Sequence, residues 1–180
     1  MPHGVIVILA LLLSSCSLLQ STTVPQLLSP AALGAQLQLN QTLVSEVDGK
    51  RQQILIALKV TQQQMLMLGL SVEGQRLFTL NYDGLSLQQK SLSSIAKKLD
   101  GEHIMRLVQL AYWPAEALRL SYGKNYQLIE LENQRRLMHY GDKIITIDYN
   151  DEPPWRGSIT IVHHQQELKL KITTTDFTAL

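Results

Sequence analysis

The histidines are the first candidates for chemistry in this sequence, because an imidazole can bind a metal ion or act as a general base. His163 and His164 are adjacent, so in a strand their side chains point to opposite faces and cannot easily share one metal ion. His103 and His139 have no carboxylate at the spacing of a metal site. We therefore expect neither a bound metal nor a cofactor.

The sequence also lacks the common motifs of catalytic sites. It contains no G-x-S-x-G, H-E-x-x-H or G-x-x-x-x-G-K pattern, and these mark serine hydrolases, zinc proteases and phosphate-binding loops. Catalytic triads are defined by geometry rather than by spacing, so a lipid hydrolase stays open as the least favoured alternative. We expect a protein that is not an enzyme.

The charged residues do not indicate a nucleic-acid partner. Lys and Arg number 16 and Asp and Glu number 15, which gives a net charge of +1 and no long-range field to attract a polyanion. Arg135 and Arg136 could form a phosphate clamp, but two adjacent arginines more often lie on a solvated strand face. We expect no binding of nucleic acid.

Cys16 is the only cysteine in the chain, and it follows an apolar segment at residues 5–13. That segment is too short to span a bilayer, which needs roughly 20 residues, but its length suits a secretory signal peptide. A single cysteine cannot form a disulfide within the chain, and a thiol outside the cytoplasm would be reactive unless modified. The alternatives are a chance cysteine after a signal peptide and a buried free thiol.

Residues 13–16, Leu-Ser-Ser-Cys, resemble the lipobox of bacterial lipoproteins. The resemblance implies cleavage before Cys16 and attachment of palmitate or similar acyl chains there, each buried CH₂ adding roughly 0.8 kcal/mol to anchoring. Ser17 stands where an Asp would resemble an inner-membrane retention signal, so sorting to the outer membrane is implied. The expected organisation is a signal peptide at 1–15, a lipidated N-terminus and tether at 16–26, and one folded domain at 27–180.

Most of the remaining chain alternates apolar and polar residues with a period of two, which is typical of strands. Turn signals such as Asp83-Gly84 separate the segments and indicate hairpins in an antiparallel meander. In the last strand Leu170 should face the core, whereas Lys169 and Lys171 should face water. The expected strands are residues 37–47, 52–61, 64–73, 76–82, 85–92, 126–132, 135–141, 143–150, 157–164 and 167–175.

Helical periodicity replaces this pattern in residues 94–123. Asp100 is suited to be the N-cap of a first helix. Pro114 is suited to the first position of a second helix, which would end at Gly123. Residues 27–33 form a weaker helical pattern, which Pro30 interrupts.

The order of elements, strands then helices then strands, predicts a mainly β fold of the α+β class. We expect a single curved antiparallel sheet of about ten strands, an incomplete β-barrel, with a helical lid inserted mid-chain over its concave face. Methionine and aliphatic side chains suit flexible hydrocarbon ligands, and the alternative is that they are ordinary core. The candidates to line an apolar cavity between sheet and lid are Ile56, Leu58, Met67, Leu107 and Trp113.

Three segments of the chain resemble a known group of proteins. They are residues 104–119 (IMRLVQLAYWPAEALR), residues 135–149 (RRLMHYGDKIITIDY) and residues 156–177 (RGSITIVHHQQELKLKITTTDF). LolB has a helix followed by a tryptophan and proline turn, and it closes with strands, a proline-containing loop and a final hairpin. The chain thus resembles the LolA/LolB superfamily of lipoprotein carriers and receptors, within it a LolB-like family of uncharacterised outer-membrane lipoproteins.

The resemblance implies a lipid-anchored protein on the periplasmic face of the outer membrane, whose cavity accepts an acyl, lipoprotein or polyene-lipid chain. It implies two partners besides that ligand, the outer-membrane bilayer and a periplasmic LolA-like carrier. Leu70 is the candidate for the exposed leucine of LolB that contacts the membrane, although the turn here lacks the Asn-Pro-Leu-Gly of LolB. The alternative is an assembly or docking lipoprotein whose core is filled.

Overall fold

The computed structural model describes residues 25–47, 50–93 and 99–180. The first half of the sheet comprises β1 (Leu37–Val47), β2 (Lys50–Val60), β3 (Met65–Leu70), β4 (Arg76–Tyr82) and β5 (Leu87–Ser91). The second half comprises β6 (Tyr126–Leu131), β7 (Gln134–His139), β8 (Asp142–Tyr149), β9 (Ser158–His163) and β10 (Leu168–Ala179). The helices are α1 (Gly101–Tyr112) and α2 (Ala115–Ser121), and the 3-10 turn η2 (Pro30–Leu33) precedes β1.

All ten strands belong to one antiparallel sheet, in the order β5-β4-β3-β2-β1-β10-β9-β8-β7-β6. The last strand returns to pair with the first, which joins two meanders into a continuous surface. Because β5 and β6 are edges, the sheet stays open rather than closing into a barrel. The expected mainly β class, a single curved sheet with helices inserted mid-chain, is confirmed.

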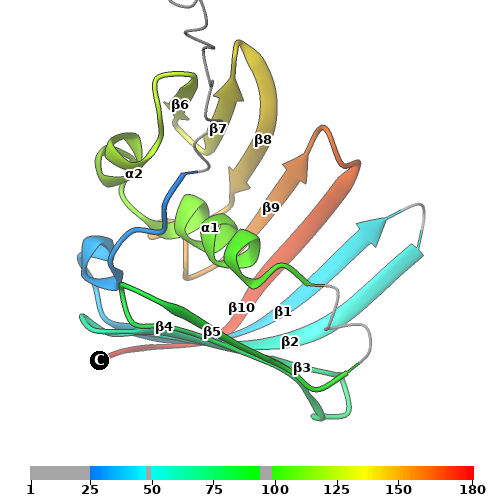
Figure 1. Ribbon diagram of the computed structural model, residues 1–180. Helices are drawn as coiled ribbons and strands as arrows, with labels where there is room; N and C mark the ends of the chain where they lie inside the picture. The colour runs from blue at the N-terminus through cyan, green and yellow to red at the C-terminus, as the bar shows by residue number, and fades with distance from the viewer. Residues whose placement is uncertain (1–24, 48–49, 94–98) are drawn as a thin grey trace, which may run out of the picture.

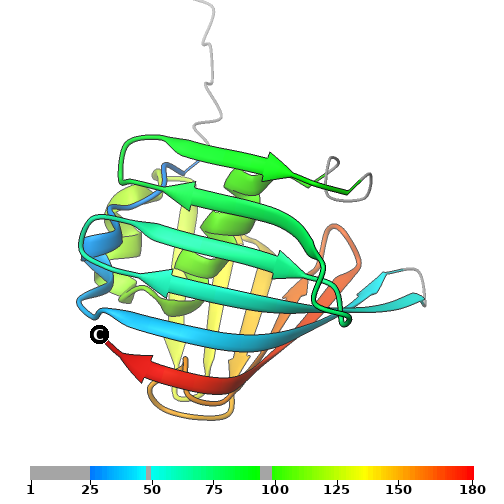
Figure 2. The ribbon, with the colours of Figure 1, turned by 90° about the horizontal axis from the view of Figure 1, so that it is seen from below.

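The sheet curves around α1, which lies against its concave face (Figure 1). The view from below shows the two halves of the sheet running in different directions with the helices between them (Figure 2). Because the sheet encloses the helix, α1 buries residues all along its length rather than a single stripe. Its buried residues are Gly101, Met105, Leu107, Val108, Gln109, Leu110, Ala111 and Tyr112.

The strand faces follow the alternation of the sequence. In β3, Met65 and Met67 are buried on the concave side, while Leu66 and Leu68, which alternate with them, are only half-buried. Gly69 continues the buried face, and a Cβ atom there would lie 2.2 Å from the ring of Phe78 on β4. Only glycine therefore allows this close approach of the two strands.

The helix ends differ in part from the expected ones. Asp100 is the N-cap of α1, and its carboxylate accepts hydrogen bonds from the backbone N–H groups of Glu102 and His103 at 3.0 and 3.1 Å, as expected. Pro114 is the N-cap of α2 rather than its first residue, since its ψ of 138° is extended. Pro30 begins η2 instead of interrupting a helix, because the missing N–H of a first position needs no partner.

The two ends of the sheet are distinct. We call the end of the sheet where β1 begins the N-terminal end. At this end Leu37 pairs with Val60 of β2 and with Ala179 of β10. The same end holds the turn between β4 and β5, because Met65 pairs with Tyr82 in the same part of the sheet. The turn between β3 and β4 belongs to the far end, five residues along β3, or roughly 17 Å at 3.4 Å per residue.

Candidate functional site

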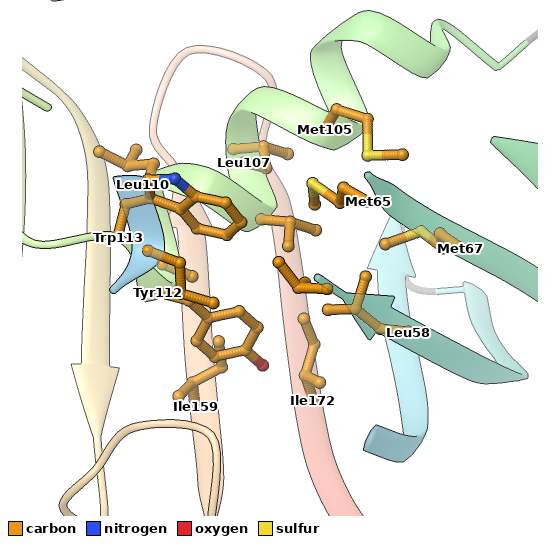
Figure 3. Close-up of a cluster of buried hydrophobic side chains, with 14 of the residues drawn as sticks. Leu58, Met65, Met67, Met105, Leu107, Leu110, Tyr112, Trp113, Ile159 and Ile172 are labelled. Atoms are coloured by element: carbon orange, nitrogen blue, oxygen red, sulfur yellow. The ribbon is translucent and has the colours of Figure 1, made fainter. Parts of the chain in front are cut away.

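The five predicted ligand-lining residues lie together in the hydrophobic core. Ile56 and Leu58 belong to β2, Met67 to β3, and Leu107 to α1, whose C-cap is Trp113. Figure 3 shows Leu58 and Met67 on the sheet and Leu107 and Trp113 on the helical side of one cluster. The structure brings the five side chains together, and their role in ligand binding stays a prediction.

Three methionines lie at the contact between lid and sheet. Met65 and Met67 come from β3 and Met105 comes from α1, and all three are buried. In Figure 3 the side chain of Met105 extends toward Met65 and Met67. Thioether side chains repack easily around a flexible partner, so this is the part of the core best suited to admit a hydrocarbon chain.

The C-terminal end of α1 is held by polar side chains of the second half of the sheet. Arg135 on β7 donates hydrogen bonds to the carbonyls of Leu110 and Trp113 and forms an ion pair with Glu130. The hydroxyl of Tyr149 on β8 donates to the carbonyl of Ala111 at 2.9 Å. These bonds satisfy carbonyl groups that a helix end leaves free.

Arg135 is only 7% exposed, so the expectation that both arginines lie on a solvated face is wrong for this residue. The physical reason is the alternation of the strand, because Arg135 has the same parity as Leu137, which is buried. That parity was visible in the sequence. The neighbouring Arg136 has the opposite parity and is half-buried.

A second buried polar contact joins α1 to the centre of the sheet. Gln41 on β1 donates from its amide to the hydroxyl of Tyr112 at 2.8 Å and to the hydroxyl of Thr174 on β10 at 3.0 Å. Burial raises the pKa of Tyr112 to about 12, partly offset by the hydrogen bond from Gln41. Tyr112 is therefore neutral at physiological pH.

Two histidines face each other between lid and sheet. His103 on α1 and His163 on β9 have ring centroids 6.1 Å apart. In the described part of the chain, His103 Nε2 and His163 Nδ1 are buried without a hydrogen-bond partner. His164 is exposed, which confirms that His163 and His164 point to opposite faces.

Burial lowers the pKa of both facing histidines. For His103 the positive charge of Arg106 lowers the pKa further, while Asp100 opposes this effect. For His163 the other causes that lower the pKa are His103 and His164, and a backbone hydrogen bond opposes them. The closed arrangement of lid and sheet therefore favours two neutral rings.

The segment before η2 is held against the lid by side chains. Gln109 on α1 accepts a hydrogen bond from the N–H of Leu28 and donates one to its carbonyl, both at 2.8 Å. The indole of Trp113 donates to the carbonyl of Ser29 at 3.3 Å, and the hydroxyl of Tyr82 donates to the carbonyl of Leu27 at 3.1 Å. The sequence reasoning missed Gln109, although it stands out as a polar residue inside an apolar helical run.

A groove of about 430 Å³ lies beside this segment. One wall is Gln26, Leu27 and Leu28, and the other is formed by the end of α2 and the residues that follow it, Leu120 to Gly123. The groove was not predicted, because it depends on how α2 packs beside a segment about ninety residues earlier in the chain.

Leu70 lies at the end of β3, at the far end of the sheet, and is half-buried. In the turn that follows, Val72 is 54% exposed. The assignment of Leu70 as a membrane contact stays a prediction. Cys16 and Ser17 lie outside the described residues, so lipidation and sorting also stay predictions.

Neither a metal cluster nor a membrane-spanning helix is present in residues 25–47, 50–93 and 99–180. In these ranges no three or more His, Cys, Asp or Glu side chains are grouped so that they could hold a metal ion. Within the same ranges, no helix has the length and apolar character needed to cross a bilayer.

Comparison with known families identifies the group to which this chain is related. Residues 38–176 match the family described as "Protein of unknown function (DUF3261)", which is well over half of the chain. The chain belongs to this family. The match confirms the prediction of an uncharacterised family. Among curated proteins, none matches the sequence.

Several solved structures are similar to this DUF3261 chain. A LolA-superfamily protein from Nitrosomonas europaea has 9% identity and a TM-score of 0.45, covering 83% of this chain and 89% of that chain. A domain from Vibrio parahaemolyticus, named for outer-membrane lipoprotein sorting, has 12% identity and a TM-score of 0.43, covering 81% and 85%. MucB, solved in complex with MucA, has 14% identity and a TM-score of 0.44, covering 85% and 53%.

Proposed function

We propose that this protein is an outer-membrane lipoprotein that faces the periplasm and carries or receives an acyl, lipoprotein or polyene-lipid chain. The anchor is an acylated Cys16 that follows a signal peptide at 1–15, and residues 16–26 tether the folded domain. The ligand lies between the concave face of the sheet and α1. The proposed partners are the outer-membrane bilayer, the apolar ligand and a periplasmic LolA-like carrier.

The observation that carries this proposal is the methionine cluster between lid and sheet. Met65, Met67 and Met105 meet across the interface of two separate elements. A chain entering there would replace helix-to-sheet contacts by contacts with its own methylene groups. This exchange changes the buried apolar area of the protein little, because the helix and the sheet stay covered in both arrangements.

The polar contacts of α1 indicate how the site opens. The C-terminal end is held by the buried Arg135 and by Tyr149. The N-terminal end is held by Gln89, an exposed residue whose side chain accepts a hydrogen bond from the N–H of Gly101 at 3.0 Å. A side chain in contact with water exchanges its hydrogen bonds readily. In this proposal α1 therefore pivots about its C-terminal end and exposes Met105.

The anchor is tested by metabolic labelling with radioactive palmitate. We expect label on the wild-type protein and none on Cys16→Ala, because the cysteine sulfur is the acylation site. Labelling that survives the substitution would refute the anchor. Recovery of the wild-type protein in the inner-membrane fraction would refute the sorting role of Ser17.

The ligand is tested by native mass spectrometry of the full chain, extracted from membranes in a mild detergent. We expect a mass increment beyond the covalent acyl groups, which organic solvent removes without removing the anchor. Tandem release of the increment then identifies its chemical class. A protein whose mass is fully accounted for by chain and anchor contradicts the carrier proposal.

A specific observation favours one second candidate, an assembly or docking lipoprotein. All five candidate residues are nearly inaccessible to water, and Trp113 is fully buried. Close packing of this kind is what an ordinary core shows. The two candidates differ in how the interior should tolerate a larger side chain.

A further inference from the structure

Among the residues that the structure describes, two leucines are almost completely exposed. Leu85, in the turn between β4 and β5, is 96% exposed, and Leu120, near the end of α2, is 89% exposed. An isolated exposed leucine is common on soluble proteins. The position of these two relative to the start of the folded chain distinguishes them.

Both leucines flank the segment that begins the described chain. On one side, the hydroxyl of Tyr82 donates to the carbonyls of Leu27 and Gly84, and a Cβ atom on Gly84 would lie 3.4 Å from Pro30. On the other side, Leu120 forms the groove wall opposite Leu27. In Figure 1, α2, η2 and the turn between β4 and β5 lie on the same side of the molecule.

Both leucines are also presented by defined local structure. The carboxylate of Asp83 accepts hydrogen bonds from the N–H groups of Leu85 and Ser86 at 2.9 and 2.8 Å, which shapes the turn so that Leu85 is its tip. Leu120 lies in the last turn of α2, whose buried residue is Leu118. The backbone that carries the two exposed side chains is therefore fixed in place, by hydrogen bonds in the turn and by the packing of Leu118 in α2.

The chain leading to this point limits how far the surface can lie from an anchored Cys16. Nine residue steps separate Cys16 from Pro25, a span of at most about 32 Å at roughly 3.3–3.6 Å per residue. The hydrogen bonds of Gln109 to Leu28 and of Trp113 to Ser29 hold residues 28 and 29 against α1, so these residues do not lengthen the tether. A bilayer that holds Cys16 therefore lies within about 32 Å of Pro25, and the surface nearest to Pro25 is the one that Leu85 and Leu120 flank.

We propose that the N-terminal end of the sheet docks on the bilayer, with Leu85 and Leu120 inserted among the lipids. The proposal rests on the proposed function through the anchor at Cys16. Charges next to the leucines are balanced, since Arg119 and Lys124 are opposed by Asp83 and Glu116, all four exposed. Docking therefore depends on apolar insertion and is insensitive to salt and to anionic lipid.

The experiment uses cysteine as a unique attachment point for a fluorescent probe. In the anchored protein the thiol of Cys16 is consumed, so in Leu85→Cys or Leu120→Cys a maleimide dye reacts only at the new position. Val72→Cys is the matched control, an exposed apolar position at the far end. The full-length variants are reconstituted in vesicles of phosphatidylcholine, with and without bromine on the acyl chains.

We expect the probes at positions 85 and 120 to be quenched by the brominated chains, lying roughly 5–10 Å into the interface. The probe at position 72 should stay in water, and added salt or phosphatidylglycerol should change none of these results. Quenching only at position 72 would overturn the proposal in favour of the turn after Leu70. Probes in water at all three positions would overturn membrane docking.

The anchor and the docking surface fail in different ways. A wild-type protein that reacts with maleimide has a free Cys16, and this refutes the anchor. An unreactive wild-type protein whose probe at position 85 remains in water refutes the docking surface alone. Because Leu85 and Leu120 are exposed, replacing them leaves folding intact, and circular dichroism checks this.

Discussion

At the scale of single residues, Arg135 connects the sheet to the lid. Its guanidinium is buried and donates to two carbonyls at the end of α1, while Glu130 balances its charge at the edge of the core. A buried cation is tolerated only where such partners exist. The contact connects β7 to the C-terminal end of α1. This is the end about which we propose that α1 pivots.

Replacing Arg135 should therefore destabilise the protein. We expect Arg135→Met to lower the free energy of unfolding by about 2–4 kcal/mol, because the carbonyls of Leu110 and Trp113 would be left buried without a donor. Arg136→Met is the matched control, with an expected loss below about 1 kcal/mol. Urea unfolding followed by tryptophan fluorescence measures both, and equal losses would contradict the assigned role of Arg135.

The facing histidines make the stability depend on pH. The pKa values of His103 and His163 are lowered in the folded state, so the unfolded chain binds more protons near its ordinary histidine pKa of about 6.5. Stability is therefore complete above that value and falls as the pH decreases toward the folded pKa values. Two charged rings 6.1 Å apart would repel each other and favour separation of the lid from the sheet.

Removing one ring of the pair should flatten this pH dependence. We expect His163→Phe to lose less stability than the wild type as the pH falls from neutral to about 5, since only His103 then remains to gain a proton. His164→Gln should keep most of the dependence, because His164 is exposed to water. Chemical unfolding at several pH values tests this, and identical slopes in wild type and His163→Phe would refute the effect.

At the scale of elements, β10 determines how the sheet is joined. It pairs with β1 over most of its length and with β9 over Leu168 to Thr173, which links the first half of the sheet to the second. Ile172 is buried, Leu170 is half-buried and packs against the core, and Lys169 and Lys171 are exposed. The predicted orientation of the strand is confirmed.

Two substitutions on β10 compare its faces. Leu170→Ala should cost about 2 kcal/mol, the lower part of the range for buried leucines, because the side chain is only half-buried. Lys169→Ala should cost less than about 0.5 kcal/mol. Thermal unfolding measures both. A larger loss for Lys169→Ala would mean that the register is displaced by one residue.

At the scale of the whole molecule, the interior is either a permanent core or a binding site. The helix α1 lies against the concave face of the sheet and covers the apolar side chains there (Figure 1). Met67 faces that interior and is buried. A larger side chain at this position separates the carrier from the docking protein.

Met67→Trp should abolish fatty-acid binding with little change in melting temperature if the lid moves to admit a chain, because the displaced lid accommodates the ring. If the interior is instead a permanent core, the same ring should lower the free energy of unfolding by roughly 1–3 kcal/mol. Leu68→Trp is the control, on the opposite face of the same strand. A large drop in melting temperature, in a wild type that binds no fluorescent fatty acid, would favour the docking protein.

The local elements of this protein followed from the sequence alone. Period-two alternation located each strand of the described residues, although β10 extends to Ala179 beyond its expected end. Asp100 marked the start of α1, because strand faces and helix caps depend on neighbouring residues. The grouping of Ile56, Leu58, Met67, Leu107 and Trp113 also followed, since a lid between two meanders can cover only their inner face.

Only the tertiary structure decided which distant polar groups meet. Gln109 holds Leu28 across 81 residues, Arg135 holds Leu110 across 25, and His103 faces His163. The same holds for the position of Leu85 and Leu120 on either side of the first described segment. These contacts depend on the curvature of the sheet and the packing angle of α1, which arise from the sum of many apolar contacts. Local sequence does not encode that sum.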